Sequence, residues 1–283
     1  MIMLKKLGNT EVPAIGLGTW EMGGRMEADR SRDSHWMDII RKGLEIGLSH
    51  IDTAEMYGNG HTEEIVGEAI KDIPRKQLFI TTKVWSTHLK YNDLLRACEN
   101  SLKRLKTDYV DLYLIHFPNP SIPIEESIYA MNILVEQKLV KQIGVSNFGI
   151  KDLETALKHS SCPIVANQIE YSLLARNKGT YLDGAESEII PYCRKKQIAV
   201  IAWRPLGKEK FNLLASHPLI MKLSEKYDAT PAQIALSWLI QQDNILTIPK
   251  TSNYQHLIEN ARAMDIQIEP DDFIRLSQSF KDE

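Results

Sequence analysis

Short runs of hydrophobic and β-branched residues recur along the whole chain, and nearly every run is followed by a segment with helical spacing. Some runs are almost entirely hydrophobic, as in Ile198–Trp203, which is typical of a strand covered on both faces of a parallel sheet. The pattern predicts eight strands, at Ile15–Trp20, Leu48–Thr53, Leu78–Lys83, Tyr109–His116, Lys141–Asn147, Ile164–Tyr171, Ala199–Leu206 and Ile245–Lys250.

Between the strands, hydrophobic residues recur every three or four positions, which predicts helices that turn one face to the sheet. A helix is also predicted to begin at Thr230, because threonine caps helix N-termini and is followed here by Pro231 and Gln233. The clearest hydrophobic stripes are Met37, Ile40 and Leu44; Leu94, Cys98, Leu102 and Leu105; and Ile124, Ile128, Met131 and Leu134.

Eight strand-then-helix units without a break in composition predict an α/β fold, a closed (β/α)8 TIM barrel that forms one domain over residues 1–283. The turn signal Gly8-Asn9 predicts a short N-terminal hairpin over Leu7–Val12. The longest irregular stretch, Gly207–Pro218, follows the seventh strand and is predicted to fold over a ligand.

An open, doubly wound sheet is the alternative, because counts of strands and helices alone do not separate the two folds. Such sheets bind dinucleotides at a G-x-G-x-x-G loop, but Gly16-Leu17-Gly18 runs into Thr19 and the third glycine is missing. The sequence also lacks a Gly-rich Walker loop. If a dinucleotide binds to this chain, it binds without these phosphate loops.

Composition and charge narrow the class of protein further. The 283 residues carry 34 basic and 37 acidic side chains, a net charge of −3, which indicates neither a nucleic-acid surface nor an electrostatic membrane anchor. No apolar run is long enough for a signal peptide or a membrane span, and three scattered cysteines fit neither a disulfide framework nor a metal clip. We expect a soluble cytoplasmic protein, a monomer or weak homo-oligomer, that acts on a small molecule.

Four chemically active residues follow the second, third and fourth predicted strands. Asp52, Lys83 and His116 stand at the strand ends, and Tyr57 lies four residues beyond Thr53. The carboxyl ends of barrel strands form one face, and neighbouring strands lie about 4.8 Å apart, so these side chains can converge.

The four residue types together suit proton transfer to a carbonyl oxygen. A free tyrosine, with a pKa of about 10, is a poor proton donor near neutrality. A buried Lys83 ammonium beside Tyr57 would lower that pKa, and Asp52 would keep the ammonium charged. His116 can donate or accept a hydrogen bond at the other edge of a substrate oxygen.

Each of these residues has a simpler interpretation when it is taken alone. Asp52 could cap a helix or turn, Lys83 could be a solvated charge, Tyr57 could pack in a loop, and His116 could be a core histidine. Four compatible groups after three successive strands favour a site.

The chain resembles the aldo-keto reductase family over nearly its whole length. The resemblance implies a (β/α)8 barrel and NADPH-linked interconversion of aldehydes or ketones with alcohols. The motifs that carry it are Gly16–Trp20, His50–Ala54, Tyr57–Asn59, Leu78–Trp85, Asp111–His116, Ile143–Phe148, Asn167–Tyr171, Pro205–Gly207, Ile248–Lys250 and Glu259–Asn260.

The resemblance also implies roles for individual residues. Tyr57 would be the general acid in reduction, Lys83 and Asp52 the pair that tunes it, and His116 the residue that orients the carbonyl oxygen. Ser146, Asn147 and Gln168 would bind the nicotinamide carboxamide, with Asp52 near the ribose; Lys250, Thr251, Ser252 and Asn253 would receive the 2′-phosphate at a helix N-terminus, and Asn260 would contact the adenine. The remaining cofactor contacts implied are Thr19, Trp20, Trp203, Arg204, Pro205, Leu206, His256 and Glu259.

Three departures from the family pattern concern the cofactor. Trp203 stands where a tyrosine usually stacks on the nicotinamide, and Arg204 replaces a small residue and is expected near the cofactor phosphates. His256 stands where an arginine often binds the 2′-phosphate. We expect NADPH to be preferred because Lys250 and the hydroxyls remain, with use of NADH left open.

On the substrate side, Trp20, Trp85 and Phe117 match aromatic positions of the family's cleft, next to His116. The segment Phe117–Pro123 is short, which predicts an open site with broad specificity for small aldehydes, ketones or sugar-derived carbonyls.

Two other functions are alternatives for this sequence. A nicotinamide-binding regulatory or redox-sensing barrel with little turnover would share the fold, but the intact set of four residues favours the enzyme. A metal-dependent barrel hydrolase needs clustered ligands, and the eight histidines show no H-x-H or H-E-x-x-H spacing, so no metal site is expected.

Overall fold

The computed structural model describes residues 2–280, in which eight parallel strands form a closed barrel. Hydrogen bonds join neighbouring strands in chain order, and the ring closes where Ile15 pairs in parallel with Thr247 and the Gly16 amide donates to the Thr247 carbonyl at 2.8 Å. The closed barrel is therefore confirmed over the open sheet. The strands are β3 (Leu17–Gly18), β4 (His50–Asp52), β5 (Phe79–Val84), β6 (Val110–Ile115), β7 (Val140–Ser146), β8 (Ile164–Glu170), β9 (Ala199–Trp203) and β10 (Ile245–Thr247).

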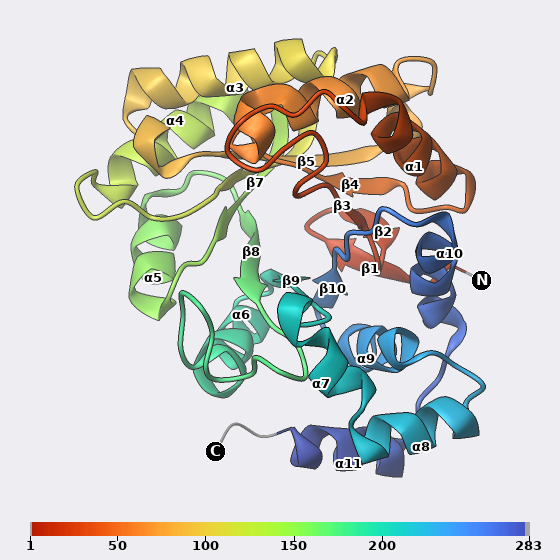
Figure 1. The fold of residues 1–283 in the computed structure, drawn as a ribbon. Coiled ribbons are helices and arrows are strands. Elements are labelled where there is room, and N and C mark those ends of the chain that lie inside the picture. Colours follow the sequence, from red (N-terminus) through yellow and green to blue (C-terminus); the bar gives the residue numbers. More distant parts are fainter. Residues whose placement is uncertain (1, 281–283) are drawn as a thin grey trace.

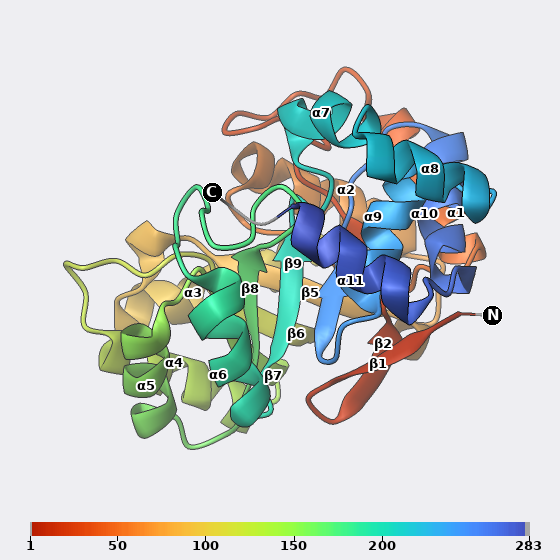
Figure 2. The ribbon, with the colours of Figure 1, turned by 90° about the horizontal axis from the view of Figure 1, so that it is seen from below.

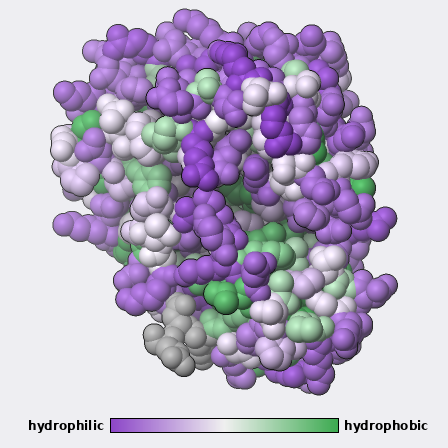
Figure 3. Space-filling view, viewed as in Figure 1, coloured by the Kyte–Doolittle hydropathy of each residue, from purple (hydrophilic) through white to green (hydrophobic). Residues whose placement is uncertain are grey.

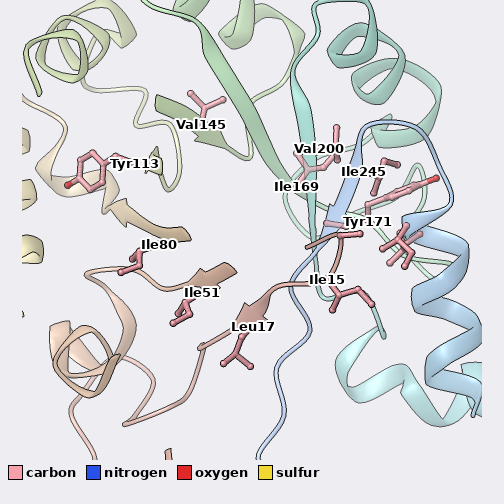
Figure 4. Packing of buried hydrophobic residues seen from close by; sticks show 14 of the residues in the cluster. Ile15, Leu17, Ile51, Ile80, Tyr113, Val145, Ile169, Tyr171, Val200 and Ile245 are labelled. Carbon is pink, nitrogen blue, oxygen red and sulfur yellow. The ribbon is translucent and has the colours of Figure 1, made fainter. Parts of the chain in front are cut away.

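Helices surround this ring of strands (Figure 1). Alternate strand side chains, such as Ile51 and Ile80, point outward to meet them (Figure 4), because successive residues of a strand face opposite sides. The helices are α1 (Asp33–Glu45), α2 (His61–Ile70), α3 (Tyr91–Leu105), α4 (Ile124–Glu136), α5 (Ile150–His159), α6 (Ile190–Lys195), α7 (Phe211–Ala215), α8 (Pro218–Lys226), α9 (Pro231–Ile240), α10 (Tyr254–Arg262) and α11 (Pro270–Ser279).

The predicted helical stripes are confirmed with small shifts. The whole α3 stripe is buried, whereas the α1 stripe centres on Ile40 and leaves Met37 and Leu44 at its edges. At the start of α9, the Thr230 hydroxyl accepts from the Gln233 amide at 3.3 Å, and the Thr230 amide donates to the Gln233 side chain at 2.8 Å. This is the predicted capping box.

The predicted hairpin forms from β1 (Leu4–Leu7) and β2 (Thr10–Pro13). It closes one end of the barrel, opposite the end where α7 lies (Figure 2). Leu7 and Val12 are fully buried against inward-facing strand residues such as Leu112. At the other end, where α7 lies, polar side chains occupy the interior of the barrel.

The prediction of a long irregular stretch at Gly207–Pro218 is wrong. This segment contains a 3₁₀ turn at Lys208–Lys210, which begins after Gly207 in a left-handed conformation (φ +71°), and the helix α7. The long irregular stretch instead lies at residues 171–184, between β8 and the helical turn Ala185–Ile189. Within residues 2–280 no helix combines the length and apolar character that crossing a membrane requires.

Candidate active site

A cavity of about 590 Å³ opens at the carboxyl ends of the strands. On this face of the molecule hydrophobic residues show around a central hollow, within a mostly hydrophilic surface (Figure 3). All four predicted chemical residues are close to it: Asp52, Tyr57 and His116 line the cavity, and Lys83 lies in contact with Asp52 and Tyr57.

Strand alternation places Asp52 and Lys83 inside the barrel. On β4, His50 and Asp52 face inward while Ile51 joins the outer core; on β5, Lys83 faces inward in the same way. Lys83 Nζ lies 2.5 Å from Asp52 Oδ1 and 2.8 Å from the Thr53 carbonyl oxygen, and its side chain is fully buried. Two opposite charges are thus held together away from solvent.

Tyr57 is held by a 3₁₀ turn, Tyr57–Gly60, in which the Gly58 amide donates to the Arg25 carbonyl of the loop after β3 at 2.7 Å. Its hydroxyl oxygen lies 3.2 Å from Lys83 Nζ. Gly58 adopts φ +56°, and a Cβ there would lie 2.6 Å from the Gly23 carbonyl oxygen, so the turn requires glycine. Asn59 is also left-handed, a conformation that asparagine tolerates.

Burial raises the pKa of Tyr57 above its ordinary value, and the Lys83 ammonium offsets this only in part. The expected net lowering is therefore wrong, since loss of solvent outweighs one neighbouring charge that Asp52 already neutralises. The pKa of Lys83 is raised: burial favours loss of its proton, but Asp52 and Tyr57 together outweigh that effect. The structure favours a protonated phenol beside a charged ammonium.

His116 follows β6 and is a neutral imidazole, because burial and the nearby Lys83 charge hold its pKa well below the usual range. Its Nδ1 atom is buried and has no hydrogen-bond partner among residues 2–280. The ring lies 5.7 Å from the Tyr57 ring, centroid to centroid. A neutral imidazole at this place can donate one N–H to a ligand oxygen.

A hydrogen-bonded network joins the ends of β7, β8 and β9. Gln168 Nε2 donates to Asp52 Oδ2 at 2.7 Å, and the Ser146 hydroxyl donates to the Gln168 carbonyl at 2.9 Å. Asn147, left-handed at φ +60°, accepts from Trp203 Nε1 at 3.2 Å. The indole ring beside the cavity is thereby fixed.

Positive charge gathers at one end of the cavity. The Lys250 ammonium and the Arg32 guanidinium lie 5.0 and 4.9 Å from the Trp36 ring centroid. Burial lowers the pKa of Lys250, and although Glu21 opposes this, the cations Arg32, Lys208 and Arg25 add to it. Like charges brought together in this way favour an anionic ligand.

Most predicted cofactor residues line the cavity, but the segment that leads into α10 does not. Asn253 caps α10 by accepting from the amides of Gln255 and His256. Arg204 lines the cavity yet donates to Glu170 at 3.4 Å and to Thr180 at 3.1 Å. The predicted residues outside the cavity lining are Thr251, Ser252, Asn253, His256, Glu259 and Asn260.

Sequence reasoning missed several residues that line the cavity. Tyr181 comes from the irregular stretch 171–184, which has no periodic pattern that would have marked it. The prediction of an open mouth did not include this stretch, which adds Tyr181 to the cavity wall. The others missed are Gly18, Glu21, Arg25, Met26, Met56, Lys208, Ile248 and Pro249.

The fold and the cavity define a (β/α)8-barrel protein with a small-molecule site at the carboxyl ends of its strands. A sequence model described as the Aldo/keto reductase family matches residues 14–280, so the chain belongs to that family and is an oxidoreductase.

Relatives with stated activities cover nearly the whole chain. Methylglyoxal reductase YeaE of Escherichia coli is 32% identical over 283 residues, which span 98% of this chain and 94% of the relative. Glyoxal reductase of Bacillus subtilis is 34% identical and covers 98% of this chain and 93% of the relative.

Solved structures agree with this assignment. The thermostable aldo-keto reductase Tm1743, in complex with the inhibitor epalrestat, is 43% identical with a TM-score of 0.91, covering 99% of this chain and 100% of its own. An aldo-keto reductase from Klebsiella pneumoniae in complex with NADPH is 34% identical with a TM-score of 0.88, covering 99% and 95%.

Proposed function

We propose that this chain, acting as one barrel domain, reduces aldehydes or ketones to alcohols with NADPH, and that the reaction is reversible. The observation that carries the proposal is the contact of a buried Asp52–Lys83 ion pair with the Tyr57 hydroxyl, 3.2 Å from Lys83 Nζ, next to a neutral His116. Carbonyl reduction requires such a proton donor beside the reacting oxygen.

The four side chains divide the chemistry of proton transfer among them. When bound, NADPH supplies a hydride to the carbonyl carbon. Tyr57, a protonated phenol, gives its phenolic proton to the carbonyl oxygen as negative charge develops there, and the Lys83 ammonium offsets part of the rise in pKa that burial causes. The Lys83 ammonium stabilises the phenolate that remains, and Asp52 keeps Lys83 charged. His116 donates an N–H to the same carbonyl oxygen and so orients it. Tyr57 regains its proton from solvent.

Two features of the chain fit the cofactor. At one end, Ser146, Asn147 and Gln168 would bind the carboxamide, and Trp203, fixed by its bond to Asn147, would stack on the nicotinamide. At the other end, the cluster of cations around Lys250 would receive the 2′-phosphate, with Thr251 and the N-terminus of α10 nearby. NADP- and NADPH-bound relatives of the same fold support this assignment.

The decisive test is Tyr57→Phe, which removes the proton donor and keeps the ring. We expect kcat to fall about 10²- to 10⁴-fold, with the dissociation constant for NADPH unchanged when measured by fluorescence titration. A variant with near-normal kcat would show that Tyr57 is not the acid. Tyr129→Phe is the matched control, because Tyr129 is not among the residues that line the cavity.

The same assay separates the enzyme from a regulatory barrel with little turnover. Loss of NADPH absorbance that depends on an added aldehyde supports the enzyme, whereas cofactor binding without turnover supports the alternative. Comparing kcat/KM for NADPH and NADH tests the cofactor preference. Equal values would contradict a role for the Lys250 cluster in selecting the 2′-phosphate.

A further inference from the structure

Tyr181 closes an arc of aromatic side chains around the cavity. It comes from the 171–184 stretch and lies between the wall formed by Phe117 and the indole of Trp203. Ring centroids follow one another at 4.8 Å (Trp20–Tyr57), 5.7 Å (Tyr57–His116), 5.2 Å (His116–Trp85), 5.7 Å (Trp85–Phe117), 4.9 Å (Phe117–Tyr181) and 5.8 Å (Tyr181–Trp203).

The position of Tyr181 is not explained by core packing, because 56% of its surface is exposed. Polar contacts to its neighbour Thr180 hold it instead. Glu170 Oε2, at the end of β8, accepts from the Thr180 amide at 2.5 Å, and Arg204 donates to the Thr180 hydroxyl at 3.1 Å. We call the contacts of Glu170 and Arg204 with Thr180 the clamp. The Arg204 guanidinium also lies 4.9 Å from the Trp203 ring centroid, so the clamp is in contact with the aromatic arc.

The chemistry of the arc indicates what it would accept. The arginines at the rim are already paired with carboxylates: Arg25 Nε lies 2.8 Å from Glu21, and Arg204 Nη1 lies 3.4 Å from Glu170. A substrate carboxylate would therefore have to compete with these carboxylates for either arginine. Around the phenol and the imidazole the wall is made of rings, which favour flat apolar groups in edge-to-face or stacked contact.

We propose that Tyr181 is a specificity-determining residue that selects carbonyl compounds with a flat apolar substituent, such as an aryl group. Thr180, Glu170 and Arg204 act as positioning residues for it. The inference rests on the proposed carbonyl reduction at the same cavity, and it narrows the broad specificity expected from sequence.

The first experiment compares benzaldehyde with propanal, two aldehydes that differ in the group attached to the carbonyl. Tyr181→Ala should lower kcat/KM for benzaldehyde about tenfold and leave propanal within about twofold, since an aromatic contact contributes on that scale. Tyr181→Phe, which keeps the ring, should behave as wild type. Tyr129→Ala is the control, because Tyr129 is similarly exposed at 59% but lies outside the cavity.

The second experiment tests the clamp. Thr180→Val removes the hydroxyl that Arg204 contacts, and Glu170→Gln removes the carboxylate charge. Each should raise the KM for benzaldehyde while kcat changes little, and neither should have a further effect in a Tyr181→Ala background. Additive effects in that background would show that these residues do not act through Tyr181.

The outcomes separate this inference from the proposed function. Equal losses for both aldehydes in Tyr181→Ala, or a weaker NADPH dissociation constant in place of altered discrimination, would overturn the specificity role. If wild type reduced neither aldehyde, the proposed function would fail. Tryptophan-fluorescence titration with benzyl alcohol would still decide the inference, because weaker binding in Tyr181→Ala alone supports it and unchanged binding contradicts it.

Discussion

At the scale of single residues, burial of the side chains shifts the pKa values of the site more than any single neighbouring charge does. Tyr57, Lys83 and His116 are all removed from solvent, and their pKa values follow from burial together with a few fixed neighbours. The Asp52–Lys83 pair stabilises the site because each buried charge compensates the other at a place where water does not solvate them.

Lys83→Met tests this dependence. The variant leaves the Asp52 carboxylate buried without its cation, so we expect the free energy of unfolding to fall by about 3–5 kcal/mol and kcat to fall with it. Denaturant unfolding and turnover measure the two effects. Arg96→Met, which removes an exposed ion pair with Asp93, should change neither. A stable Lys83→Met would mean that the pair contributes nothing to the fold.

His50, buried one position before Ile51, gives the fold a dependence on pH. Burial lowers its pKa from 6.5 to about 4. The unfolded chain therefore binds the proton more readily, and stability that is complete above pH 6.5 is lost as the pH falls toward 4, by about 3 kcal/mol. His116 acts in the same direction.

Chemical unfolding at pH 7 and pH 4.5 measures this loss. His50→Gln should reduce the difference in unfolding free energy between the two pH values, even if it lowers stability at both. His159→Gln, at an exposed position of α5, serves as the control and should keep the wild-type difference. An unchanged pH difference in His50→Gln would rule out this source of acid sensitivity.

At the scale of elements, short turns rather than strands fix the geometry around the barrel mouth. Asp52 and Lys83 are placed by strand alternation alone, but Tyr57 depends on a turn with three consecutive left-handed residues, Gly58, Asn59 and Gly60. The irregular stretch 171–184 plays a similar part for Tyr181, through contacts with Glu170 and Arg204.

Gly58→Ala tests the turn. Its Cβ would lie 2.6 Å from the Gly23 carbonyl oxygen and φ is +56°, so the turn must shift and displace Tyr57. We expect kcat to fall more than about tenfold and stability to fall by at least about 1 kcal/mol. Gly149→Ala is the control, because φ there is −75° and its Cβ would meet only a Leu182 methyl at 4.0 Å. Wild-type kcat in Gly58→Ala would contradict this account.

At the scale of the whole molecule, the residues that stabilise the barrel and those that carry its proposed chemistry lie at opposite ends of the barrel axis. The hairpin closes the amino end with Leu7 and Val12, while the polar groups lie at the carboxyl end (Figure 2). Such a division lets the loops at one end vary without disturbing the core at the other.

Leu7→Ala tests this division. Removing a fully buried leucine from the closed end should cost about 2–5 kcal/mol of unfolding free energy and leave kcat/KM of the folded enzyme unchanged. Leu4→Ala, at a position 53% exposed, should leave both values at wild type. A large loss of kcat/KM in Leu7→Ala at a temperature where it stays folded would show that the two ends are coupled.

The sequence by itself determined the order of strands and helices, which favoured a barrel, and the positions of Asp52, Lys83 and His116 at strand ends. Both follow from local rules: hydrophobic periodicity separates strands from helices, and a residue at the carboxyl end of a strand is at the mouth wherever the strand lies. The loop position of Tyr57, four residues beyond Thr53, also came from the sequence pattern. The motifs of the family added the cofactor positions, whose roles stay proposals.

Only the tertiary structure decided the rest. The direction of the Tyr57 pKa, the pairing of Arg204 with Glu170 and Thr180, and the arrival of Tyr181 at the mouth depend on segments that are distant in sequence. The irregular stretch 171–184 has no periodicity from which its path could be predicted, and burial is a property of the assembled barrel. The hydrophobic pattern determines which side chains each strand turns toward the inside of the barrel. Closure of the barrel determines which residues those side chains contact.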